Sequence, residues 1–137
     1  MAFTGPFEDR VAIHELVAAY ADAITVRDGA AWKALWAEDS EWQLPLIPGM
    51  ESIKGREAIF AAWEAAMKDF PKMVGRAHLG MLEVNGDTAK GRAYPTEFII
   101  FDDGTTRTDY GQYDDEYVKQ DGIWLFSRRV HSIHYSG

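Results

Sequence analysis

Five side chains in this sequence could move protons or hold developing negative charge: Tyr20, His78, Glu97, Tyr113 and Asp115. A buried phenol donates a hydrogen bond at neutral pH, and a histidine can both take and give a proton. A carboxyl group in an apolar cavity has a raised pKa, which suits acid or base work. These residue types favour proton transfer on a small molecule.

The face that each side chain occupies follows from alternation along a strand. Asp115 shares a face with Tyr113, and an inward face would make it a protonated acid beside a ligand. Alternatively, Asp115 is a surface or salt-bridged carboxylate, paired with Arg128 or Arg129. Both interpretations stay open from the sequence.

Two more candidates depend on strand alternation in the same way. Glu97 alternates with Ile99 and becomes a candidate general base if that face is inward, but a solvated carboxylate if it is not. His78 alternates with Leu82, which predicts a place on the cavity wall as the acid or base. The alternatives for His78 are a hydrogen-bonded core histidine or an interface residue.

The remaining candidates shape a space rather than react. Trp42 and Tyr94 are expected to line a cavity or a dimer interface, and Tyr20 could be a packed aromatic with its hydroxyl at the rim. His131 and His134 fall on opposite faces of one strand, so they cannot form a simple two-histidine metal site. We therefore expect no metal and no cofactor.

Three turn signals organise the second half of the chain: Asn85-Gly86, Asp103-Gly104 and Asp121-Gly122. These pairs supply the positive φ angles that tight hairpins need. The runs between them are rich in β-branched and aromatic residues. The sequence therefore predicts an antiparallel four-stranded meander over about 74–84, 88–101, 106–120 and 123–133.

The first half of the chain has helical spacing of apolar residues. It predicts a long helix that starts near Pro6 and stops at Gly29, a short helix over about 31–36 and a third over 56–70 that ends at Pro71. A strand is expected over 40–46. Helices followed by a twisted sheet indicate one α+β domain, 1–137, in which a curved, mostly antiparallel sheet wraps around the long helix. The resulting cone would have a cavity at its open end, suited to a small hydrophobic or aromatic ligand.

The composition narrows the function further. The chain has 137 residues, with 14 basic and 22 acidic ones and a net charge of -8, which disfavours nucleic acid and anionic membrane partners. It has no cysteine, so disulfides and thiolate metal sites are excluded. No run is long and apolar enough to span a membrane, and no signal peptide is recognisable, so we expect a cytoplasmic protein.

Several sequence pieces resemble the NTF2-like superfamily, specifically its SnoaL-like branch, which is similar to ketosteroid isomerases, scytalone dehydratase and polyketide cyclases. The pieces are Ile13-His14-Glu15-Leu16 through Tyr20-Ala21-Asp22-Ala23, Ala37-Glu38-Asp39-Ser40, Ile53-Lys54-Gly55-Arg56-Glu57-Ala58-Ile59, and Gly111-Gln112-Tyr113-Asp114-Asp115-Glu116-Tyr117 with Asp121-Gly122-Ile123-Trp124. The resemblance spans almost the whole chain. It implies the cone fold, and it implies a homodimer, which we expect to form through the outer face of the sheet.

The resemblance also implies roles for particular residues. Tyr20 resembles the tyrosine that donates to a developing enolate in the isomerases, Asp115 their protonated acid, and His78 the histidine of the dehydratases. The likeness fails at three positions: Thr25 and Ile99 stand where the dehydratases have a catalytic aspartate and a second histidine, and Leu44 where the isomerases have a carboxylate.

Two functions follow from these residues and the resemblance. The first is a cofactor-free enzyme, of isomerase, dehydratase or cyclase type, acting by proton transfer on a hydrophobic cyclic or carbonyl compound. In it His78, Tyr20 and Asp115 are catalytic, while Tyr113, Trp42, Glu97, Tyr94 and Thr25 contact the substrate. The second is a binding or accessory module without chemistry.

Overall fold

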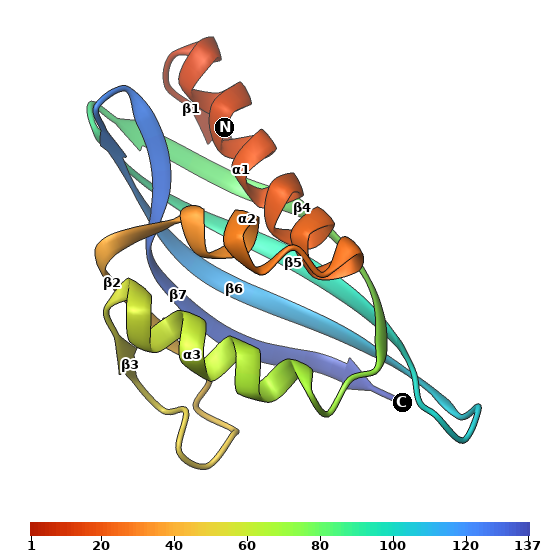
Figure 1. Cartoon of the computed structure of the whole chain (residues 1–137). Coiled ribbons are helices and arrows are strands. Elements are labelled where there is room, and N and C mark those ends of the chain that lie inside the picture. The colour runs from red at the N-terminus through yellow and green to blue at the C-terminus, as the bar shows by residue number, and fades with distance from the viewer.

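The computed structural model describes residues 1–137, with three helices on one face of a seven-stranded mixed sheet (Figure 1). The strand order is β1-β4-β5-β6-β7-β2-β3, and the sheet does not close on itself. The helices are α1 (Phe7–Val26), α2 (Gly29–Ala34) and α3 (Arg56–Met67). The strands are β1 (Phe3–Thr4), β2 (Trp36–Gln43), β3 (Ile53–Lys54), β4 (Lys72–Asn85), β5 (Thr88–Ile100), β6 (Thr106–Gln120) and β7 (Ile123–Ser136). The predicted α+β cone is confirmed.

The long helix α1 packs its apolar stripe, including Leu16, Tyr20 and Ile24, against the sheet. It ends at Val26 because Arg27 adopts a left-handed conformation, with φ 58°. The prediction that Gly29 stops this helix was wrong. Gly29 begins α2 instead, where the Asp28 side chain accepts a hydrogen bond from the backbone N–H of Ala31 and caps the helix.

The predicted meander is confirmed, with β4 to β7 paired antiparallel in sequence order. Gly86 has φ 67°, and Asp121 and Gly122 both have positive φ, as two-residue hairpin turns require. The strand predicted over 40–46 begins four residues earlier, at Trp36, and α3 ends three residues before the predicted Phe70. The two-residue strands β1 and β3 were not predicted.

Strand β4 contains a bulge at Gly80, which changes the side chains that face the core. Leu79 pairs with Ala93 and Met81 pairs with Arg92, so Gly80 is the extra residue. Leu79 is buried before the bulge, and Leu82 is buried after it. Side chains four residues apart across this point therefore lie on opposite faces of the sheet.

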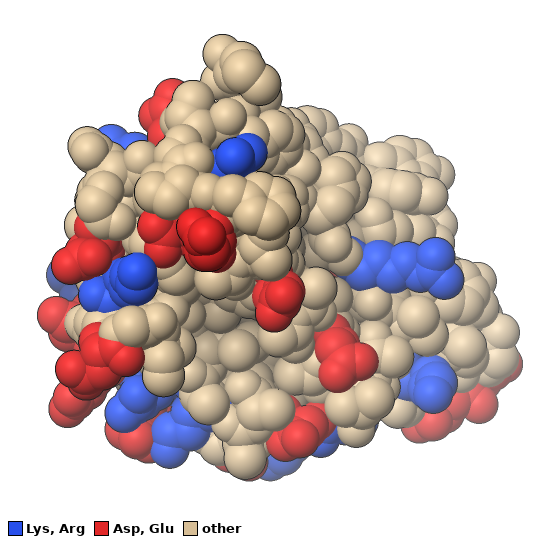
Figure 2. Space-filling model, turned by 90° about the horizontal axis from the view of Figure 1, so that it is seen from above, with Lys and Arg blue, Asp and Glu red and all other residues tan.

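The core lies between the helices and the inner face of the sheet, and Trp32, Trp36, Trp42 and Trp63 form an aromatic cluster within it. No helix is both long and apolar enough to cross a bilayer. Acidic and basic side chains are interspersed on the surface seen in Figure 2, with no large basic patch in that view.

Candidate functional site

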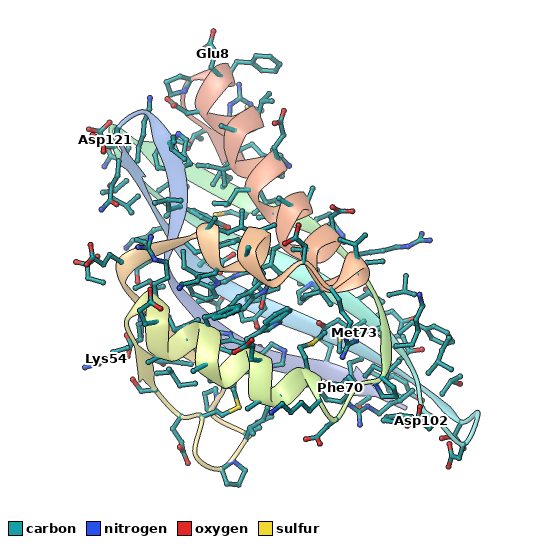
Figure 3. All side chains as sticks on the ribbon, viewed as in Figure 1. Glu8, Lys54, Phe70, Met73, Asp102 and Asp121 are labelled. Atoms are coloured by element: carbon teal, nitrogen blue, oxygen red, sulfur yellow. The ribbon has the colours of Figure 1, made fainter.

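A cavity of about 350 Å³ opens between the inner face of the sheet, α3 and the segment after β2. Fourteen of its nineteen lining residues are hydrophobic, so the few polar groups in it determine its chemistry. Phe70, in the connection after α3, and Met73, near the start of β4, both line it (Figure 3).

Strand alternation places the polar groups of the cavity in two cross-strand rows. Glu97 of β5 pairs with Asp109 of β6, and Tyr113 of β6 pairs with His131 of β7. All four line the cavity. Glu97 therefore faces inward, which was the condition for it to be a candidate general base.

Two tyrosines form a hydrogen-bonded pair at the inner end of the cavity. The hydroxyl oxygens of Tyr20 and Tyr113 are 3.3 Å apart, and the Trp42 indole N–H donates to Tyr113 over 3.0 Å. Burial raises the pKa of Tyr113 to about 12 and that of Tyr20 well above its ordinary value, so both phenols are protonated at neutral pH. Two hydroxyl hydrogens serve one bond between the phenols, which leaves one hydrogen free to donate to a ligand.

A buried ion pair lies behind this tyrosine pair. The Arg129 guanidinium donates to both carboxylate oxygens of Asp115, over 2.7 and 3.0 Å, and the Tyr117 hydroxyl donates to the same carboxylate over 2.7 Å. The guanidinium carbon of Arg129 lies 3.9 Å from the ring centre of Tyr113 and 4.4 Å from that of Tyr20. A cation against the aromatic rings holds them in place.

Asp115 therefore does not line the cavity, contrary to the prediction that it faces a ligand. Burial raises the pKa of Asp115, while Arg129 and Tyr117 lower it through the bonds just described. Asp115 in turn raises the pKa of Arg129, so the guanidinium stays charged and the carboxylate is its counter-ion. Of the two interpretations that the sequence left open, pairing with Arg129 is the one observed.

Glu97 is the one carboxyl group in the cavity without a hydrogen-bond partner from the protein. Burial is the main reason that its pKa rises to about 7, and the neighbouring charge of Asp109 adds to the shift. The charges of Arg129 and Arg107 oppose it. A carboxylate with a pKa near neutrality is available as a base and still strong enough to take a proton.

His131 is a cavity residue that the sequence reasoning missed. Burial, and secondly the charge of Arg129, lowers the pKa of His131 to about 4, so its imidazole is neutral at pH 7. A β-carbon on Gly111 would lie 3.0 Å from His131 Nε2, so the glycine makes room for the ring. The available signal was alternation, since His131 shares a face with Arg129 and pairs with Tyr113.

The mouth of the cavity carries a second ion pair. Arg107 donates from Nε and Nη2 to the two carboxylate oxygens of Asp109, both over 3.0 Å, and Ser136 also donates to Asp109. The Arg107 guanidinium packs against the rings of Phe70 and Phe101. Asp109 is therefore committed to Arg107, unlike Glu97.

His78 lies on the outer face of the sheet, exposed to solvent, and the prediction that it lines the cavity was wrong. The bulge at Gly80 is the physical reason, because it reverses the alternation that linked His78 to the buried Leu82. The His78 ring packs beside Tyr94, with ring centres 5.6 Å apart.

Two predicted substrate contacts also lie outside the cavity. Tyr94 is on the outer face, where its hydroxyl accepts a hydrogen bond from Arg92. The Thr25 hydroxyl donates to Ala21 O and accepts from Gly75 N–H, so it fastens α1 to β4. Trp42 and Tyr113 do line the cavity, and their contact with a substrate stays a prediction.

No group of three or more His, Asp or Glu side chains is arranged to bind a metal ion. His131 and His134 lie on opposite faces as predicted, and His134 pairs with Gln112 outside the cavity.

The fold and the cavity together define a cone-shaped α+β protein with a mostly apolar cavity at its open end. The sequence matches the SnoaL-like domain family over residues 6–130, so the chain belongs to that family. No protein of curated function matches the sequence significantly.

Solved structures with the same fold include a provisionally assigned aromatic ring hydroxylase from Novosphingobium aromaticivorans, 26% identical, with a TM-score of 0.85 and coverage of 96% of this chain and 93% of that one. A provisionally assigned scytalone dehydratase from the same organism is 22% identical, with a TM-score of 0.84 and coverage of 95% and 87%. A hexachlorocyclohexane dehydrochlorinase, LinA-type3, from Novosphingobium barchaimii is 21% identical, with a TM-score of 0.79 and coverage of 95% and 89%. The likeness to the last two shows the fold alone.

Proposed function

We propose that this protein is a cofactor-free enzyme that moves a proton at a carbon next to a carbonyl group in a small, mostly apolar molecule. Isomerisation, dehydration and cyclisation all contain such a step. One observation carries the proposal: Glu97, unpaired and with a pKa of about 7, shares an apolar cavity with a phenol pair that has one unused hydrogen.

The proposed roles follow from these groups. Glu97 removes the proton from carbon, and its rate advantage comes from a pKa close to the working pH. The free hydroxyl hydrogen of the Tyr20–Tyr113 pair donates to the carbonyl oxygen and stabilises the enolate that forms. Neutral His131 supplies a further N–H donor or nitrogen acceptor on the cavity wall. Glu97 thus takes the role that the sequence had suggested for His78.

The cavity volume limits the substrate. A volume of about 350 Å³ lies toward the lower end of the range for small-molecule pockets, roughly 300–1,000 Å³. The aromatic walls, including Trp42 and Trp63, favour a flat or aromatic ring system.

Two neighbours of the same fold are compatible with this chemistry. Their names denote loss of water and loss of hydrogen chloride. Both eliminations include removal of a proton from carbon, which is the step proposed here. The identity of these proteins to this chain is too low to carry over a substrate.

A second candidate is a binding module that holds a ligand without chemistry. It is favoured by Thr25, Leu44 and Ile99, which replace the catalytic residues of the related enzymes. Leu44 lines the cavity as an apolar side chain, and Thr25 is committed to the backbone of β4.

The test is hydrogen–deuterium exchange at acidic C–H bonds of one- and two-ring ketones in D₂O, followed by NMR. We expect wild-type protein to accelerate exchange, and Glu97→Gln to lower the rate by about 10²- to 10⁴-fold. Glu64→Gln, on an exposed side chain of α3, is the matched control and should leave the rate unchanged. Exchange that Glu97→Gln does not slow would reject the role of Glu97. Tight binding without any exchange would favour the second candidate.

A further inference from the structure

One wall of the cavity carries two carboxyl groups that lie opposite each other on neighbouring strands. Glu97 of β5 and Asp109 of β6 are direct partners in the antiparallel register, and both side chains line the cavity. Side chains at directly opposed positions have β-carbons about 4.5–5.5 Å apart, and like charges at such positions repel each other. A positive charge placed beside the two groups would relieve this repulsion.

The protein supplies a counter-ion to only one of the two carboxyl groups. Arg107 donates from Nε and Nη2 to the two oxygens of Asp109, both over 3.0 Å, and makes no hydrogen bond to Glu97. Arg129, the other guanidinium near the cavity, is held by two hydrogen bonds to Asp115. Three carboxyl groups therefore share two guanidinium groups, and the charge of ionised Glu97 is left without a partner.

Aromatic rings line the same cavity as the unpaired carboxyl group. They include Trp42, Trp63 and Tyr113. The face of an aromatic ring is negative and attracts a cation, most strongly in tryptophan. A positively charged ligand would therefore be attracted by both Glu97 and the aromatic walls, whereas an anionic ligand would be repelled by both.

The cavity also offers acceptors for the hydrogens of an ammonium group, which carries three donors and no acceptor. Glu97 has two carboxylate oxygens, and the neutral ring of His131 has one unprotonated nitrogen. Neither side chain has a hydrogen-bond partner within the protein. These free acceptors suit an ammonium group on a ligand.

We propose that the cavity binds small aromatic amines in their protonated form, with the ammonium group against Glu97 and the ring against the aromatic walls. This inference uses the cavity and the carboxyl group of the proposed function, but it does not depend on the proton transfer. Glu97 acts here as a counter-ion rather than as a base. Such an amine would occupy the place of the carbonyl compound and compete with it for the cavity.

Amine binding should depend on pH, because Glu97 carries a charge only when it is ionised. With a pKa of about 7, about nine-tenths of this group is ionised at pH 8 and about one-tenth at pH 6. The titratable and charged side chains that face it, from α1, β6 and β7, are Tyr20, Arg107, Asp109, Tyr113, Arg129 and His131. The raised pKa values of the two phenols, and the pKa of about 4 of the imidazole, keep these groups in one form between pH 6 and 8. Ionisation of Glu97 therefore sets the pH dependence of amine binding.

The test is titration calorimetry with benzylamine, which is protonated at pH 8, and with benzyl alcohol, a neutral molecule of nearly the same shape. We expect wild-type protein at pH 8 to bind benzylamine about 10- to 100-fold more tightly, as for a hydrogen bond between charged groups. Glu97→Gln should remove this preference, and the control Glu64→Gln, at an exposed position on α3, should keep it. From pH 8 to pH 6 the affinity of wild-type protein for benzylamine should fall by about tenfold, whereas that for benzyl alcohol should stay the same.

Equal affinity of wild-type protein for the two probes at pH 8, or a preference for benzylamine that persists in Glu97→Gln, would overturn the inference. The comparison of pH 6 with pH 8 uses wild-type protein alone, so it decides the question if Glu97→Gln does not fold. The exchange assay separates this inference from the proposed function. Benzylamine binding through Glu97 without any ketone exchange would reject the enzyme and keep the amine site, whereas ketone exchange without a preference for the amine would do the reverse.

Discussion

The cavity contains two titratable groups, Glu97 and His131, whose pKa values are shifted in opposite directions by the same cause. Burial disfavours the charged form of each, which raises the pKa of Glu97 from 4.5 to about 7 and lowers that of His131 from 6.5 to about 4. Because pKa differences between folded and unfolded protein make stability depend on pH, each group leaves a signature that can be measured without knowing the substrate.

The sign for Glu97 is set by which state binds the proton more tightly. Folded protein does, so this group contributes stability at low pH that is lost as the pH rises from about 4.5 to about 7. At about 1.36 kcal/mol for each pKa unit, the loss in unfolding free energy is at most about 3 kcal/mol. This is an upper value, because the Glu97 side chain is only partly buried and solvent in the cavity can screen its charge.

The sign for His131 is the reverse. Unfolded protein binds the proton more tightly, so this group lowers stability at acidic pH, and the unfolding free energy recovers as the pH rises from about 4 to 6.5. The size is again at most about 3 kcal/mol. Between about pH 4.5 and 6.5 the two contributions nearly cancel in the wild-type protein.

Replacing one of the two groups should therefore reveal the pH dependence of the unfolding free energy that the other group produces. Glu97→Gln removes the falling contribution, so stability should rise by up to about 3 kcal/mol from pH 4.5 to 6.5. At pH 8 the same variant should be more stable than wild type, because wild-type folding then buries an ionised carboxylate. His131→Gln should show the opposite slope, with stability that falls from pH 4.5 to 7.

Urea unfolding followed by tryptophan fluorescence at pH 4.5, 5.5, 6.5 and 8 measures these slopes. Glu64→Gln, which removes one negative charge from an exposed position on α3, controls for the change in net charge. If Glu97→Gln followed the wild-type pH profile, the carboxyl group would not be buried with a raised pKa, and its proposed role as a base near neutrality would lose its physical ground.

Three further outcomes are expected. Asp115→Asn should lower the unfolding free energy by about 3–5 kcal/mol, because it leaves the buried Arg129 without its counter-ion. Urea unfolding measures this change. The control Asp114→Asn, at an exposed position, should have little effect on the unfolding free energy. Tyr113→Phe should weaken binding of ketones but not of hydrocarbons of the same shape, as measured by titration calorimetry, and equal weakening of both would argue against a hydrogen bond to the ligand oxygen. His78→Ala should leave C–H exchange rates within about threefold of wild type, since its side chain is outside the cavity.

The sequence alone determined the sheet and much of the cavity wall. The turn signals at Asn85-Gly86 and Asp121-Gly122 are local, because Gly86, Asp121 and Gly122 supply the positive φ angles within the turns themselves. Period-two alternation then put Tyr113 on one face with Asp115, whereas the face of Glu97 stayed open until the structure placed it in the cavity. The helical stripe placed Tyr20 inside for the same local reason.

Alternation failed where a residue was inserted into a strand. The bulge at Gly80 arises from the pairing of β4 with β5, and a β-carbon there would lie 2.6 Å from the Tyr94 ring. Nothing in the local sequence of β4 distinguishes this glycine from one in a regular strand. His78 was therefore assigned to the wrong face.

Only the tertiary structure decided which groups are free to react. Asp115 and Glu97 are both inward carboxyl groups by alternation, but Asp115 meets Arg129 across the sheet while Glu97 meets no hydrogen-bonding partner. His131 became a cavity residue because Gly111, twenty residues away, leaves it space. Strand periodicity depends on near neighbours in the chain, whereas desolvation and ion pairing depend on residues that folding brings together from distant positions.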